Sequence, residues 1–199
     1  TGYVGGAIGG LIGSAYNTNV LSSNSNATIY GDAFIGGLIG SFQSTPSALN
    51  VQNSYSTGNV NYYYSSLMGY TAVDYDGGGV DTGHVGGLVG FIRSGEVQTS
   101  YASGNVMLVT SGYLTSINST LPAPETTNKI GGLVGKIDNN NLVLGGGTIN
   151  ASYAGGDVEG LDDVGGLIGV AIESNISNSY TQNTTSVTGV NNVGAFVGN

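Results

Sequence analysis

Val85-Gly86-Gly87-Leu88-Val89-Gly90 is one of six copies of a short block that returns along the 199-residue chain. In every copy the first and fifth positions are Val or Ile, and the second and sixth are Gly. The other five copies are assigned to begin at Val4, Ile35, Ile130, Val164 and Val193. A block with constant chemistry and variable spacing is the signature of a repeat architecture.

A second block alternates with the first, in the form Asn-Ser-Tyr-x-Thr-Gly-Asn-Val and close variants. Its clearest copies contain Tyr55, Tyr101 and Tyr153. Looser copies are assigned at Ser14-Ala15-Tyr16, leading to Val20, and at Asn178-Ser179-Tyr180, leading to Val187. Equivalent residues of successive repeats should stack at the inter-strand spacing of about 4.8 Å. The tyrosine column is therefore predicted to contain Tyr16, Tyr55, Tyr101, Tyr153 and Tyr180.

Both blocks favour strands over helices. They are short, rich in β-branched and aromatic residues, and bounded by turn formers, whereas paired glycines would cost a helix about 1 kcal/mol each. The fold class is therefore all-β: a right-handed parallel β-helix (solenoid) of about six rungs in one domain spanning 1–199. Insertions are predicted at 61–84 and 107–129. Strict alternation would put the Leu on the face opposite the Val and Ile of the block. A bend at the Gly-Gly pair is expected to turn this Leu inward; the alternative is that insertion loops cover the outer face.

Composition limits the function. The net charge is −9, from 12 acidic residues against Arg93, Lys129 and Lys136. No basic footprint for nucleic acid can be assembled from three bases, and an anionic membrane surface is disfavoured. There is no cysteine for disulfides, and the apolar stretch 3–16 is too short for a transmembrane helix. These features suit an extracellular or cell-surface location.

The combination of Val-Gly-Gly-Leu-Val-Gly with Asn-Ser-Tyr-x-Thr-Gly-x-Val resembles the GLUG repeat family, over essentially the whole chain. That family occurs mainly as repeat scaffold in large secreted or surface-anchored microbial proteins, including adhesin-like chains. The resemblance implies a structural or adhesive role at the cell surface, and it supplies no catalytic residues to carry over.

The alternative is a carbohydrate-active enzyme, or a carbohydrate-binding module, on a β-helix. Polygalacturonase-like sites have Asp-Asp before Gly-His-Gly, whereas here His84 precedes the only Asp-Asp pair, Asp162-Asp163. Three scattered bases are too few to stabilise a carbanion beside a uronate. Asp162 and Asp163 are interpreted as a solvated turn and His84 as a surface or corner residue. No enzymatic activity and no cofactor is predicted.

Three kinds of candidate site remain. The acidic, glycine-rich stretch 74–81 could bind Ca²⁺ through Asp74, Asp76 and Asp81, although a flexible acidic turn explains it as well. A group of tyrosines in the insertions could form an exposed platform for surface glycans or other chains, or could pack against the solenoid. Asn26 and Asn118 are glycosylation sequons in spacers. The platform residues are Tyr62, Tyr63, Tyr64, Tyr70, Tyr75 and Tyr113.

The ends of the repeat array carry no polar cap in the sequence, although solenoids normally need one. The first assigned block starts at Val4 and the last ends at Gly198. Two explanations stay open. Either adjoining repeats of a longer chain cover the ends, or copies of the chain self-associate head to tail as subunits of a filament.

Overall fold

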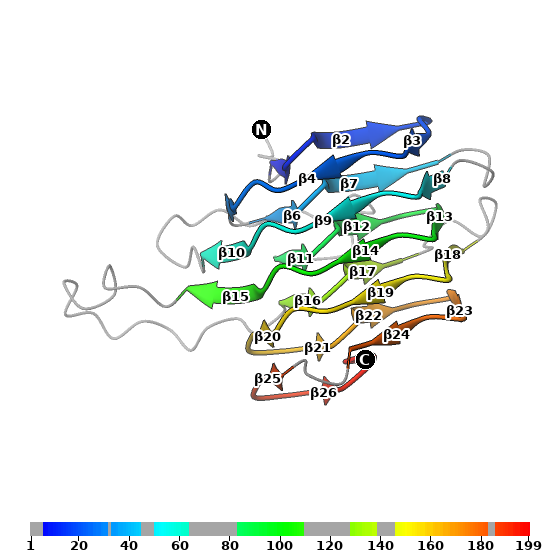
Figure 1. Ribbon diagram of the computed structural model, residues 1–199. Coiled ribbons are helices and arrows are strands. Elements are labelled where there is room, and N and C mark those ends of the chain that lie inside the picture. Colours follow the sequence, from blue (N-terminus) through cyan, green and yellow to red (C-terminus); the bar gives the residue numbers. More distant parts are fainter. Residues whose placement is uncertain are drawn as a thin grey trace, which may run out of the picture.

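The protein forms a parallel β-solenoid in a computed structural model, which describes residues 6–31, 33–44, 50–63, 83–109, 128–138, 146–182 and 186–199. These ranges hold 26 short strands and no helix, and every strand pairing is parallel. Five successive strands make one rung, so the described chain contains five rungs and the beginning of a sixth (Figure 1). The predicted all-β solenoid is confirmed.

The strands build five sheets, which we call A to E in chain order. Sheet A contains β1 (Ala7–Gly9), β6 (Phe34–Gly36), β11 (His84–Gly86), β16 (Lys129–Gly131), β21 (Val164–Gly165) and β26 (Val193–Gly194). Sheet B contains β2 (Ile12–Tyr16), β7 (Ile39–Gln43), β12 (Val89–Ile92), β17 (Val134–Ile137) and β22 (Ile168–Ala171). Sheet C contains β3 (Val20–Leu21), β8 (Asn50–Gln52), β13 (Gly95–Gln98), β18 (Gly147–Asn150) and β23 (Asn175–Ser177). Sheet D contains β4 (Asn24–Ser25), β9 (Tyr55–Ser56), β14 (Tyr101–Ala102), β19 (Tyr153–Ala154) and β24 (Tyr180–Thr181). Sheet E contains β5 (Ile29–Gly31), β10 (Val60–Tyr63), β15 (Val106–Val109), β20 (Val158–Glu159) and β25 (Val187–Thr188).

The rungs form two layers joined at the edges. In Figure 1, sheets D and E make the near layer, sheets A and B the far layer, and sheet C closes the right-hand edge. The near strands run from right to left and the far strands from left to right, while the chain descends from its N-terminal end. This sense of winding is right-handed, the hand that parallel crossovers adopt almost always.

The first rung corrects two parts of the sequence interpretation. Ile8 pairs with Ile35 and Ile12 with Ile39, so the first block begins at Ile8 rather than at Val4. Two overlapping stretches, 4–9 and 8–13, both fit the block because each contains a Gly-Gly pair. The structure uses the second stretch, which has Leu11 at the fourth position. Tyr16 lies in β2 beside Gln43, outside the tyrosine column. The column position of the first rung is held by Asn24, next to Tyr55.

The two long insertions are narrower than predicted. Asn61–Tyr63 belong to β10 and His84 to β11, so the first connection covers 64–83 rather than 61–84. Met107–Val109 belong to β15 and Lys129 to β16, so the second covers 110–128 rather than 107–129. Both connections join sheet E to sheet A.

The interior is divided into two apolar clusters. One lies between sheets B, C and D and includes the Leu of the repeated block, at Leu38, Leu88, Leu133 and Leu167, all fully buried. The other lies between sheets A and E and contains Ile35 and its column neighbours. The first-block strand in sheet A ends at the first Gly of the pair, and the strand in sheet B begins after the Leu. The chain therefore bends between them, which confirms the predicted inward turn of the Leu.

The third-position glycines form the narrow waist between these clusters. A Cβ at Gly87 would overlap the carbonyl oxygen of Gly132 and would lie 2.8 Å from the Cβ of Ala102 in sheet D. The same relation joins Gly37 to Ser56. The facing column in sheet D is correspondingly small, because there is room only for Ser, Ala or Thr. Glycine is thus required here by the close approach of the two layers.

One corner of the solenoid repeats an unusual backbone conformation. The residue between sheets C and D has φ between 48° and 51° in each of the five rungs, although none of these residues is glycine. Left-handed backbone tightens the turn, and Asn tolerates it better than most side chains do. The five corner residues are Ser22, Asn53, Thr99, Ala151 and Asn178.

Candidate functional site

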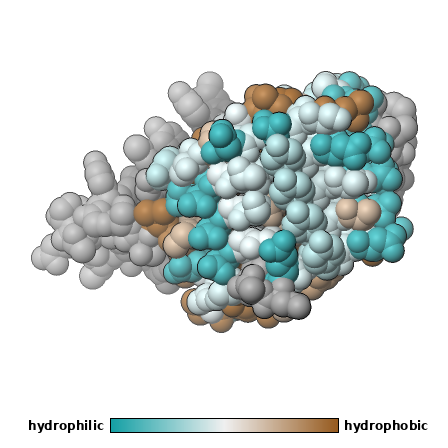
Figure 2. All heavy atoms as spheres, in the orientation of Figure 1, coloured by the Kyte–Doolittle hydropathy of each residue, from teal (hydrophilic) through white to brown (hydrophobic). Residues whose placement is uncertain are grey.

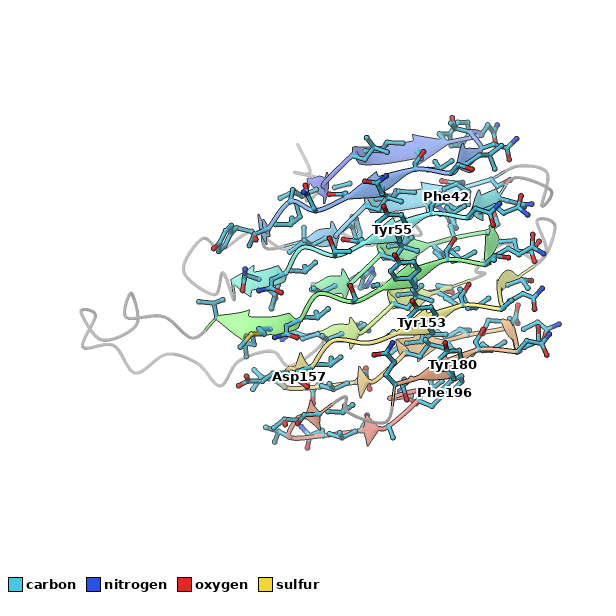
Figure 3. All side chains as sticks on the ribbon, in the orientation of Figure 1. Phe42, Tyr55, Tyr153, Asp157, Tyr180 and Phe196 are labelled. Carbon is cyan, nitrogen blue, oxygen red and sulfur yellow. The ribbon has the colours of Figure 1, made fainter. Side chains whose placement is uncertain are left out.

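The outer face of sheet D carries a continuous stack of four tyrosine rings, running down the near layer (Figure 3). Ring centroids of Tyr55, Tyr101, Tyr153 and Tyr180 are 4.9, 4.9 and 5.1 Å apart, and successive rings are parallel within 10°. Stacked rings cover each other's faces, so this ladder presents ring edges and hydroxyl groups to solvent. The exposed flat face that sugar stacking needs is open only at the ends of the ladder.

The inner face beside the tyrosines carries a ladder of serines that fixes the register between rungs. The hydroxyl of Ser100 donates to the carbonyl of Gln98 at 2.8 Å and accepts from the backbone N–H of Ser54 at 3.1 Å. Ser152 and Ser179 repeat this arrangement in the following rungs. Each serine therefore satisfies a buried backbone group of its neighbour, and a slip by one residue would leave these groups unpaired.

A third ladder of amide and carboxylate side chains follows the turn between sheets D and E. The side-chain oxygen of Asn59 accepts from the backbone N–H of Asn105, and that of Asn105 from the N–H of Asp157, both at 3.0 Å. Asp157 continues the series by accepting from Ser186 at 2.8 Å. These side chains hydrogen-bond one rung to the next. This structural role is enough to explain why Asn or Asp recurs at the position, and it requires no bound ligand.

Burial raises the pKa of the Tyr153 phenol above its ordinary value of 10.0, and the neighbouring Tyr101 and Tyr180 raise it further. The Tyr153 ring is stacked between those of Tyr101 and Tyr180, at centroid distances of 4.9 and 5.1 Å. The neutral phenol of Tyr153 is therefore retained across the physiological range.

The far layer carries a different and irregular group of side chains. Phe34 and His84 are neighbours in sheet A, and Phe91 lies in sheet B, with ring centroids 4.9 to 5.5 Å apart. His84 is fully buried. The expectation of a surface or corner histidine is therefore wrong, because the imidazole packs between two phenyl rings.

Next to this aromatic group lies a buried ion pair. Lys136 Nζ is 2.7 Å from Asp138 Oδ2 and 6.0 Å from the centroid of the Phe91 ring. Both side chains are less than a tenth exposed. Sequence inspection missed this pair, because the column of Lys136 changes from Ser41 to Phe91 to Lys136 to Val170 and shows no repeat to follow.

The predicted Tyr platform loses its first member. The side chain of Tyr62 is 2% exposed, packs in the cluster between sheets A and E, and donates to Asn128 Oδ1 at 2.8 Å. A buried ring offers no surface to a glycan. Tyr63 lies in β10, but its side chain lies outside what the structure describes. Tyr64, Tyr70, Tyr75 and Tyr113 also fall outside the described residues.

Of the remaining predicted site residues, some lie outside the described ranges and one lies within them. Asp74, Asp76, Asp81 and Asn118 fall outside the described residues. Within the described ranges, no three His, Cys, Asp or Glu side chains gather as a metal site would require. Asn26 is exposed between β4 and β5, where a glycan would fit.

The Asp-Asp pair precedes β21 as expected, but it is not a fully solvated turn. Asp162 is buried and accepts from Asn191 Nδ2 at 2.6 Å, and Asp163 accepts from Asn192 Nδ2 at 2.8 Å. Sheet register puts Asp163 two rungs from His84, about 10 Å along the axis. This part of the structure therefore does not bring the histidine and the Asp pair together.

The two ends of the solenoid expose large apolar side chains, and two of these, Leu11 and Val193, hold positions that the neighbouring rungs bury completely at Leu38 and Val164. Among the residues that the structure describes, nine large apolar side chains are at least 36% exposed; four belong to the first rung, four lie at or after Ile172, and Met107 lies between. Figure 2 shows apolar patches at the upper and lower ends of the molecule. The eight end residues are Leu11, Tyr16, Leu21, Tyr30, Ile172, Tyr180, Val190 and Val193.

Comparison with protein families, curated proteins and solved structures gave no significant match. No helix in the described ranges has the length and apolar character needed to cross a bilayer. The functional argument therefore rests on the geometry of the ladders and of the two ends.

Proposed function

We propose that the protein is a non-catalytic structural and adhesive scaffold at the cell surface or outside the cell, extended at its ends by further rungs. The observation that carries the proposal is that positions buried in the middle of a register-locked solenoid are open at its two described ends, at Leu11 and Val193. A terminal rung has no neighbour on one side, so its core positions stay open unless another rung covers them.

The distribution of charged residues and prolines supports the proposal that further rungs cover the ends. No Asp, Glu, Lys or Arg occurs before Asp32 or after Glu173, and the three prolines are Pro46, Pro122 and Pro124. Edge strands in monomeric proteins are usually protected by charges, prolines or a covering element. The first rung and the strands after Glu173 carry no charge or proline that would oppose pairing, which favours association along the axis.

The extracellular setting is supported by composition and by the resemblance to GLUG repeats. A chain with three bases and a net charge of −9 suits a hydrated outer surface better than a nucleic-acid or anionic-membrane partner. A covering rung can come from a second copy or from adjoining repeats, and the two sources make different predictions in solution.

Electron microscopy and sedimentation of the purified chain over a range of concentrations test the proposal. We expect end-to-end association that grows with concentration, and Leu11→Lys should suppress it by placing a charge on the open end. Met107→Lys is the matched control, since Met107 is exposed in the middle of the solenoid. Discrete particles at every concentration would contradict self-association and leave adjoining repeats as the source of the rung. Release of reducing sugar from polysaccharides would contradict the non-catalytic role.

A further inference from the structure

The tyrosine ladder on sheet D gathers side chains that share an oxidation chemistry. A phenol that meets a one-electron oxidant loses one electron and one proton and becomes a phenoxyl radical. The chain has 13 tyrosines but no cysteine and no tryptophan to take up the oxidation first. Its two methionines form sulfoxides instead, which is a two-electron oxidation. A one-electron oxidation of this protein is therefore expected to settle on tyrosine.

The backbone holds the ladder rings at a constant spacing. Tyr153 N–H donates to the carbonyl of Ser100 at 3.1 Å, and Tyr180 N–H donates to that of Ser152 at the same distance. Successive ring centroids then lie 4.9 to 5.1 Å apart. Because these bonds keep each ring beside the next, a radical on one ring meets its neighbour at a high effective concentration. Coupling within one chain is therefore favoured over coupling between chains.

The spacing also lets the rings turn their reactive edges toward one another. Aromatic pairs adopt both stacked and edge-to-face arrangements at centroid separations of about 4.5–7 Å, a range that includes the 4.9 and 5.1 Å of this ladder. The torsion about the Cβ–Cγ bond of tyrosine is broad, and rotation about this bond leaves the ring centroid in place. Rotation points a Cε atom, which carries unpaired spin in a phenoxyl radical, at the neighbouring ring. Since Tyr153 and Tyr180 hold the same strand position, Cε then faces Cε.

We propose that the ladder is a site of oxidative cross-linking, at which a haem peroxidase and hydrogen peroxide join neighbouring tyrosines as dityrosine. Each of two phenols loses one electron and one proton, and the two radicals form a carbon–carbon bond between their Cε atoms. Each bonded carbon then gives up its proton and each oxygen regains one, which restores both phenols. The protein loses two hydrogen atoms in total, and one hydrogen peroxide is reduced to two molecules of water.

The cross-link joins successive rungs covalently in a chain that has no cysteine for disulfides, which are the usual cross-links of extracellular proteins. A bond between Tyr153 and Tyr180 closes a loop of 27 residues, and one between Tyr101 and Tyr153 a loop of 52. Such a bond stabilises a fold by limiting the unfolded chain. The inference goes beyond the proposed scaffold function, because it assigns a covalent modification to the middle of the near layer.

Treatment of the purified chain with a haem peroxidase and hydrogen peroxide tests the proposal, at protein concentrations where sedimentation shows single chains. We expect dityrosine fluorescence in a product that stays monomeric on a denaturing gel and has lost two hydrogen atoms for each cross-link. Cleavage after Asp and Glu separates the tyrosines, because 139–157 contains Tyr153 alone and 174–199 contains Tyr180 alone. Mass spectrometry should find these two peptides linked. Dityrosine confined to covalent dimers, or a monomeric product without linkage at Tyr153, would overturn the proposal.

Variants of the protein locate the coupling. Tyr153→Phe keeps a ring in the stack but removes the phenol, and should abolish the linked pair of peptides, with circular dichroism used to check the fold. Tyr16→Phe is the matched control, because Tyr16 lies outside the ladder beside Gln43, and it should leave the yield of the pair unchanged. Oxidation of the unfolded chain in urea removes the fixed spacing and should lower that yield at least about tenfold. An equal yield from folded and unfolded chains would show that the ladder does not direct the coupling.

The stability of the product tests the consequence of the cross-link. The cross-linked chain should unfold at a higher urea concentration than the untreated chain, since the new bond limits the unfolded state. Tyr153→Phe treated in the same way controls for oxidation elsewhere, including at the exposed Met107, and should gain less. An equal gain in both proteins would overturn the assignment of the stabilising bond to Tyr153.

Discussion

The same ladder position behaves differently in the middle of the solenoid and at its ends. The block Leu is fully buried at Leu38, Leu88, Leu133 and Leu167, but Leu11 in the first rung is 51% exposed. In sheet A, Val164 is fully buried, whereas its neighbour Val193 is 45% exposed. A rung therefore does not bury its own core residues. Burial comes from the rungs above and below, so stability is a sum of contacts between neighbours.

The largest difference in stability between the middle and the end should come from truncating the Leu of the repeated block to Ala at each place. Leu88→Ala removes a fully buried side chain and should lower the free energy of unfolding by about 2–5 kcal/mol. Leu11→Ala, in the half-exposed position, should cost less than about 1 kcal/mol in the dissociated chain. Urea denaturation of both variants measures this. Equal losses would mean that the end rung is as well packed as the middle.

A side chain at the glycine waist should have the next largest effect. Gly87→Ala forces a Cβ against the backbone of Gly132 and should destabilise the chain by about 1–3 kcal/mol. Gly6→Ala is the matched change near the N-terminal end, where a Cβ would have nothing within 4 Å. It should shift the free energy of unfolding by no more than about 0.5 kcal/mol. Ala195 already occupies the waist position of the sixth rung, which has no described strand of sheet D. Thermal unfolding measures the stability of the two variants. Equal melting temperatures would contradict the claim that the close approach of the two layers at Gly87 excludes a side chain.

The serine ladder gives a smaller contrast. Ser100→Ala leaves the buried backbone N–H of Ser54 without its acceptor and should cost about 1–3 kcal/mol. Ser23→Ala removes the first member of the ladder, whose hydroxyl donates locally to Leu21, and should cost about 0.5 kcal/mol or less. Hydrogen exchange of the Ser54 amide provides a local readout. Unchanged protection in Ser100→Ala would show that the hydroxyl does not hold the register.

The smallest effect concerns pH. The raised pKa of Tyr153 means that the folded state holds the phenol proton more tightly than the unfolded chain does. The associated stability is fully present below the ordinary pKa of 10.0 and is lost as the pH rises through the folded-state pKa. Tyr153→Phe should therefore flatten the fall in melting temperature above about pH 10. An unchanged fall in melting temperature in Tyr153→Phe would contradict the raised pKa of Tyr153.

Sequence reasoning predicted the solenoid because its signal is repeated chemistry. The first residues of four blocks, Ile35, Val85, Ile130 and Val164, pair with one another in sheet A. Aligning any two copies of the block in the sequence predicts this strand register. The first rung failed because the repeat is ambiguous there: Gly5-Gly6 and Gly9-Gly10 both fit, and Asn24 replaces the tyrosine. Matching Leu11 to Leu38 would have resolved the choice.

The candidate sites were less predictable because they depend on contacts that no repeat encodes. Tyr62 sits among other tyrosines in the sequence, so its burial follows only from the inward face of β10 and its bond to Asn128. The interpretation of His84 as a surface or corner residue rests on the absence of a second histidine in the sequence. In the structure Phe34, from the preceding rung, and Phe91, from sheet B, pack against its ring. Only the fold shows these partners.

The direction of the backbone hydrogen bonds has a mechanical consequence. The bonds that join rungs run along the solenoid axis, so tension applied at the two ends would peel strands apart one rung at a time rather than shear a whole sheet at once. One rung spans 27 residues from Ile8 to Ile35 and 52 from Tyr101 to Tyr153. Each yielding rung would release about 90–190 Å of extended chain. A surface tether built this way would lengthen in steps under load and absorb a pull before its anchorage fails.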